Sequence, residues 1–265
     1  MKIRKTFRIL AALFRIRLSR QMSDPAGYLA AFFVDTSVFL IQAAAFGAIY
    51  LNVDEIRGWD AWRSLFFVGT FTLVDGLFMA GYFFGLLKLP TEIASGRLDL
   101  VLAKPADPLL LLSFDSVNPG SFLLMLPAFG MLAAAVSRSG YAVTPVGVLS
   151  YAAAVALSLV LVYDLMTLFR TSAFWLTRAG ALQEGENLLM EFAFRVPGKV
   201  YSGVFRLIFR VLLPYGLIAA FPVEAFFGEA SPLSALAVVA TVAAFGLLRR
   251  LAWKRGLARY SGTGS

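Results

Sequence analysis

The chain has 265 residues, of which 59% are hydrophobic and 15% are charged. Soluble domains are closer to half apolar and a quarter charged, so this composition is typical of an all-α integral membrane protein. The absence of cysteine and histidine excludes disulfides and thiol or histidine catalysis, and in a membrane protein a net charge of +8 directs attention to the loops rather than to nucleic acid.

The first predicted element is an amphipathic helix over residues 1–22. Its apolar residues recur every three or four positions, at Ile3, Phe7, Leu10, Phe14 and Leu18. Basic residues occupy much of the rest, a pattern that favours a helix lying in the membrane interface. Its simplest role is to anchor the chain to anionic lipid.

Six apolar stretches follow, each close to the 20 or so residues that a helix needs to cross a bilayer. They cover residues 28–51, 65–87, 120–137, 146–169, 204–223 and 232–251. The third is short, and the fifth carries Arg206 and Arg210 in its first turns. The sequence therefore predicts one polytopic domain over residues 1–265 with six transmembrane helices.

The basic residues are divided unevenly between the segments outside these spans. Counting the basic residues in the first turns of the fifth span and the last residues of the sixth with the segments next to them, the N-terminal segment, the connections after the second and fourth spans, and the C-terminal segment hold 21 of the 24 Lys and Arg residues. Because basic residues are retained on the cytoplasmic side, both termini are predicted to be cytoplasmic. Residues 88–119 then form a cytoplasmic segment.

Three acids lie inside predicted spans, and acids there are costly and are functional candidates. They are Asp35, Asp75 and Asp164, which together with Gln42 are candidates for a translocation path, and Asn118 is a weaker polar companion. Asp35 and Gln42 are two helical turns apart and share a face of the first span. A pair of carboxylates could relay protons or bind a cation. Alternatively, each carboxyl is protonated or bonded to a neighbouring helix.

A proline-bounded stretch follows the fifth span. Between Pro222 and Pro232 the chain carries Glu224 and Glu229 and no basic residue. This stretch is predicted on the non-cytoplasmic side. It fits either a short re-entrant element or an ordinary turn with aromatic residues at the headgroups.

Enzyme motifs are absent. The sequence has no GxxxxGK[ST] phosphate-binding loop, no HExxH and no GxSxG. We therefore expect no enzymatic activity and no cofactor or metal. Energy for any transport must come from another chain or from an ion gradient.

The cytoplasmic segment contains one short amphipathic element. Leu98, Val101 and Leu102 share a helical face, and Pro105 and Pro108 are predicted to end the helix. A helix this short is marginal in water, so it must lean on lipid or on a partner protein.

The residues of this element resemble a motif of the ABC-2-type permeases. The similar stretches are Gly96-x-Leu98-Asp99-x-x-Leu102-x-Lys104-Pro105, Leu213-Pro214 and Trp253-x-x-Gly256-Leu257-x-Arg259-Tyr260. The resemblance implies a bacterial inner-membrane permease of an ABC exporter. It also implies a second permease, either identical or a sister chain, and a separate ATPase subunit.

By the same resemblance, six residues would couple the permease to the ATPase. They are Gly96, Leu98, Asp99, Leu102, Lys104 and Pro105. The N-terminal helix would be the elbow helix on the membrane surface. We expect replacement of Leu98 and Leu102 by aspartate to abolish ATPase association without affecting insertion. Two alternatives are an ion-coupled transporter that uses the intramembrane aspartates, and a non-transporting membrane scaffold.

Overall fold

A computed structural model describes residues 15, 25–176, 180–196 and 199–260. The predicted amphipathic helix over residues 1–22 lies outside the described residues, apart from Arg15. The described part is helical and contains no β-strand, only an isolated bridge between Ile56 and Trp59. The all-α prediction is confirmed.

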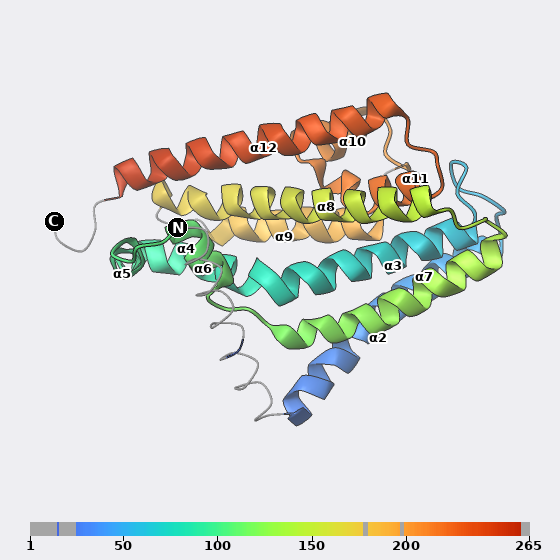
Figure 1. Cartoon of the computed structure of the whole chain (residues 1–265), viewed down its shortest axis with the longest axis horizontal. Helices are drawn as coiled ribbons and strands as arrows, with labels where there is room; N and C mark the ends of the chain where they lie inside the picture. The colour runs from blue at the N-terminus through green and yellow to red at the C-terminus, as the bar shows by residue number, and fades with distance from the viewer. Residues whose placement is uncertain (1–14, 16–24, 177–179, 197–198, 261–265) are drawn as a thin grey trace.

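Long helices form the body of the molecule and run along a common direction in Figure 1. They are α2 (Pro25–Tyr50), α3 (Ala61–Phe78) with its continuation α4 (Phe84–Ala94), α7 (Met125–Ser139), α8 (Pro145–Thr171) and α12 (Pro232–Arg259). A π-helical turn, η1 (Met79–Phe83), joins α3 to α4, and a 3-10 turn, η2 (Pro119–Leu124), precedes α7. These helices match the first, second, third, fourth and sixth predicted spans, and each is long and apolar enough to cross a membrane.

Shorter elements fill the connections. They are α5 (Leu98–Leu102), α6 (Pro108–Phe114), η3 (Ser172–Phe174), α9 (Gly180–Arg195), α10 (Gly203–Leu207), η4 (Ile208–Leu212), η5 (Pro214–Leu217) and α11 (Ala220–Phe226). We call the end of the bundle that carries Gly96–Pro105 the motif end, and the opposite end the far end. In Figure 1, α5 and the last turns of α12 lie together at the motif end.

Capping residues set where three of the long helices begin. The side chains of Asp60, Thr144 and Ser231 each accept a hydrogen bond from a backbone N–H in the first turn of α3, α8 and α12. Proline follows the cap in α8 and α12, where its fixed φ suits the first helical position. The predicted starts at residues 65, 146 and 232 are therefore correct to within a turn or so.

The central helix is α3, and α7 packs along it. In the most apolar stretch of the α3–α4 span 72% of the residues are buried, against 6% in α2 and 11% in α12. Gly69 and Gly76 allow the close approach, because an added Cβ would lie 3.0–3.2 Å from Leu132, Leu124 and neighbouring atoms of α7 and η2. The outer helices α2 and α12 thus present most of their apolar surface outward.

The fifth predicted span, residues 204–223, is not a straight helix. The described segments Gly203–Leu212 and Pro214–Phe226 meet at an angle of 82° around Leu213 and Pro214. Lys199, just before the first segment, pairs with Glu229, just after the second, and Glu229 also contacts Arg63 at 3.4 Å. Because Arg63 lies in the first turn of α3, both ends of the segment lie at the far end. Residues 203–226 therefore form a re-entrant hairpin.

The crossing from the motif end to the far end falls instead to α9. Figure 1 shows α9 running alongside α8, and the two are joined by contacts between Arg170 and Glu186. Residues 170–203, expected as a cytoplasmic connection, thus contain a helix packed within the bundle, and Lys199 and Arg210 lie near the far end. Five described helices are long and apolar enough to cross a membrane, or six if the bent pair Gly203–Leu212 and Pro214–Phe226 counts as one span.

Candidate functional site

The motif segment, which we define as Gly96–Pro105, begins with a glycine in the left-handed conformation. Gly96 has φ +73°, a conformation that side chains with a Cβ rarely adopt, and it ends α4 so that the chain can turn into α5. Arg97 donates to both carboxylate oxygens of Glu92, at 3.2 and 2.8 Å, and this hydrogen bonding raises the pKa of the guanidinium. The motif glycine therefore permits the turn between α4 and α5.

The motif leucines do not share an exposed face. Leu98 is fully buried in the core with Ile93 and Leu109, whereas Leu100 is 70% exposed and Leu102 is 37% exposed. Asp99, Lys104 and Pro105 are exposed. Leu98 thus anchors α5 to the bundle, and its role in coupling stays a prediction. Leu100, which sequence reasoning missed, is the most exposed apolar side chain of the segment.

The chain after α5 turns back onto α4. Pro108 does not end a helix but begins α6, capped by the Asp107 carboxylate, which accepts from the backbone N–H of Leu110 at 2.9 Å. Gly85 of α4 faces the α6 backbone so closely that an added Cβ would lie 2.1 Å from the carbonyl oxygen of Ser113. The motif segment is thus held at both of its ends.

The C-terminal motif meets the same end of the bundle. Phe174 of η3 lies flat against Gly256, where an added Cβ would lie 2.2 Å from its ring, and its ring also contacts Trp253 and Tyr260. Burial raises the pKa of the Tyr260 hydroxyl, and the nearby Asp99 carboxylate adds to the effect. Two separate sequence motifs therefore converge at the motif end.

The Asp164 carboxylate is buried and forms an ion pair, so it is not exposed to a translocation path. Its carboxylate is 1% exposed and accepts from Arg249 Nε of α12 at 2.5 Å, and the Arg249 guanidinium lies 5.1 Å from the centre of the Tyr163 ring. The pair joins α8 to α12. The structure does not bring Asp164 together with Asp35 and Asp75.

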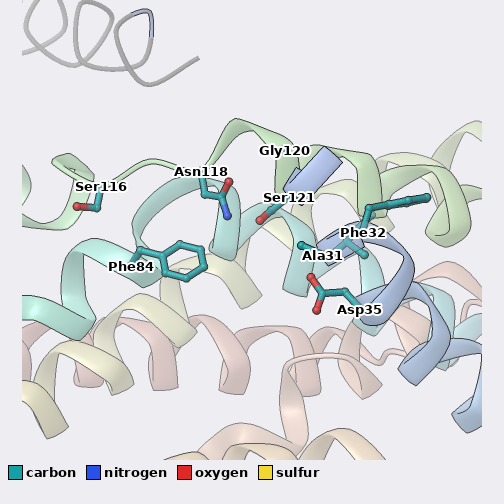
Figure 2. Close-up of a pocket in the computed structure, with 10 residues that line it drawn as sticks. Ala31, Phe32, Asp35, Phe84, Ser116, Asn118, Gly120 and Ser121 are labelled. Carbon is teal, nitrogen blue, oxygen red and sulfur yellow. The ribbon is translucent and has the colours of Figure 1, made fainter. Parts of the chain in front are cut away.

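Asp35 lies in the wall of a cavity between α2, α4 and η2, shown in Figure 2. The cavity has a volume of about 260 Å³, and its wall includes Ser116, Asn118 and Ser121. Asp75 of α3 is close enough to Asp35 for the two charges to interact. Gln42 is not part of the wall, although it shares α2 with Asp35. The described residues include no group of three or more metal-binding side chains.

Sequence reasoning missed a second polar cluster. Arg170 of α8 and Glu186 of α9 are 1% and 0% exposed, and their side chains approach to 3.1 Å. The Tyr215 hydroxyl in the re-entrant hairpin donates to Glu186 at 3.1 Å, and Arg170 donates to Asn187 at 3.2 Å. The cluster ties the hairpin to α8 and α9 in the interior.

A protein-family model described as "ABC-2 family transporter protein" matches residues 37–264. The match includes both sequence motifs, the re-entrant hairpin and most of the bundle. No curated protein and no solved structure shows significant similarity to the chain.

Proposed function

The chain belongs to the ABC-2 transporter family, and from this premise we propose that it is the permease of an exporter driven by a separate ATPase that docks on the motif segment. As a member of this family it is a membrane-spanning permease component of an ABC transporter and not itself the ATPase. The observation that carries the proposal is the exposure of Leu100 beside Asp99 and Lys104 on a firmly anchored α5.

The motif segment has the geometry that such docking needs. An exposed apolar side chain ringed by charged ones is typical of a protein contact rather than of a lipid contact. Leu98 fixes α5 to the core, and Tyr260 lies against Asp99, so a displacement of α5 would reach both α4 and α12. These contacts support a coupling role for the segment.

We further propose that the motif end is cytoplasmic and that the membrane is a bacterial inner membrane. The N-terminal and C-terminal basic clusters support this orientation by the positive-inside rule. A second permease, identical or a sister chain, would cover part of the apolar surface that α2 and α12 leave exposed.

Replacement of Leu100 by aspartate tests the docking proposal. We expect the tagged variant to reach the membrane normally but to lose most of the co-purifying ATPase, because a charge replaces the exposed apolar contact. The matched control is Leu51→Asp, which makes the same change at an 85% exposed leucine in the loop after α2, at the far end. Quantitative mass spectrometry of the purified complexes, with ATPase activity as a second readout, measures the effect.

Two outcomes would contradict the proposal. Equal ATPase recovery with Leu100→Asp and Leu51→Asp would show that the motif segment is not the docking site. Absence of any ATPase with a phosphate-binding loop from the wild-type complex would argue for an ion-coupled transporter or a scaffold instead.

A further inference from the structure

We propose that the cavity between α2, α4 and η2 binds the ammonium group of an amphiphilic substrate, with the Asp35 carboxylate as its counter-ion. This inference rests on the proposed permease function, for which it names a class of substrate. It is carried by the shape and lining of the cavity, and by the observation that no basic residue in the described part of the chain pairs with Asp35.

The size of the cavity suits a head group rather than a whole drug-sized molecule. Its volume is about 260 Å³. Sites that enclose drug-sized ligands usually occupy about 300–1,000 Å³. A ligand held here would therefore place its polar head in the cavity and leave its apolar part outside, against the lipid-exposed surface of α2.

The lining favours a cation. Of the described residues in its wall, Asp35 is the one that carries a charge, and hydroxyl or amide groups come from Ser116, Asn118 and Ser121. Figure 2 shows the Asp35 carboxylate facing this space from α2, with Phe32 and Phe84 also labelled around it. Aromatic ring faces attract ammonium groups through their quadrupole, and carboxylates attract them by charge. The carboxylate, the hydroxyl groups and the aromatic rings of the wall are together suited to bind an ammonium group.

No basic side chain among the described residues is a counter-ion for Asp35. Within the described residues, neither Asp35 nor its neighbour Asp75 has an ion pair or a side-chain hydrogen bond. Other acids of the bundle do have bases, as in Asp164 with Arg249 and Glu186 with Arg170. A ligand ammonium group beside Asp35 would favour the ionised form of this carboxyl, which no described basic side chain does.

Lys88 does not supply this charge. Its ammonium group donates to the hydroxyl of Ser116 at 2.5 Å, and Lys88 is not part of the cavity wall. Figure 2 places Ser116 at the opposite side of the drawn residues from Asp35. The charge within the cavity is therefore that of Asp35.

The position of Asp35 allows entry from the membrane. Asp35 lies six residues after Leu29, where the first apolar span begins, which is about 9 Å along the helix axis. That depth is within reach of an amphiphile whose head group enters from the interface. Since only 6% of the residues in the apolar stretch of α2 are buried, little protein stands between this helix and lipid.

Binding of dodecyltrimethylammonium to the purified full-length chain tests the inference. Isothermal titration in dodecyl maltoside micelles, corrected by titration into empty micelles, compares the wild type with Asp35→Asn and Asp35→Glu. The micelle detergent has the same alkyl chain and a neutral head, so it accounts for apolar binding. We expect Asp35→Asn to weaken binding at least about tenfold and Asp35→Glu to retain it, because only the former removes the charge.

Each result decides the inference. Equal affinity of the wild type and Asp35→Asn would overturn the ammonium site. Absence of binding by the wild type would also overturn it. If that wild-type chain still recovers its ATPase, the permease assignment stands. Charge-dependent binding by a chain that recovers no ATPase would support the ammonium site while contradicting the proposed ATP-driven function.

Discussion

The acids within the bundle lie on two sides of it, and the two sides differ in whether these acids are paired with basic residues. On the side of α8, α9 and α12, Asp164 and Glu186 are each paired with an arginine. On the side of α2 and α3, Asp35 and Asp75 have no such partner among the described residues, and a cavity adjoins Asp35. The neighbouring helix thus decides whether an acid in the bundle is ion-paired or lies beside a cavity.

The largest expected effect is that of Arg170→Met. It would leave the Glu186 carboxylate buried without its cation, which typically destabilises a protein by about 3–5 kcal/mol. Thermal unfolding of the purified chain in detergent measures the loss. The double variant Arg170→Met, Glu186→Gln should recover part of it, because no buried charge then remains. If the double variant is no more stable than the single one, pairing is not what holds this side together.

A smaller loss is expected for Asp164→Asn. Arg249 is 19% exposed and can turn its guanidinium toward water when the carboxylate is removed. The expected cost is about 1–3 kcal/mol, in the range for breaking a buried hydrogen bond to a charged group. The same unfolding measurement applies. A loss as large as that of Arg170→Met would mean that the two paired acids are equally enclosed.

The smallest effect on stability is expected for Asp35→Asn. The amide has nearly the same shape, and no protein cation loses its partner, so the change in unfolding free energy should be about 0.5 kcal/mol or less. This result, together with the weaker ammonium binding predicted above, would separate a binding acid from a structural one. A loss of several kcal/mol would place Asp35 with the paired acids and remove the contrast.

The sequence was sufficient for most of the fold but not for the fifth crossing. Five spans follow directly from continuous apolar stretches, and capping residues such as Thr144 and Ser231 define two of their starts. Helix α9 was not predicted from the apolar stretches because Glu184, Glu186 and Glu191 lower its mean hydropathy. Its burial depends on Arg170 and Tyr215, which approach it only in the folded chain.

The sequence predicted a short helix at Leu98–Leu102, but not which of its leucines is buried. A helix of five residues such as α5 has too few turns for periodicity to decide which side faces the core. The choice between Leu98 and Leu100 is made by contacts with Ile93 and Leu109, on two other helices. The asparagine and serines around Asp35 likewise come from a connection distant from α2 in the sequence, and their proximity could not be inferred from spacing.

The contact at Gly85 determines how the motif segment responds to a push. Because no side chain separates the backbones of α4 and α6, these helices are in direct contact, and the segment between them is held at both ends. A displacement of α5 at Leu100 would therefore be expected to move α4 and α6 together. The rigidity of the α4–α6 pair therefore depends on residue 85 having no side chain.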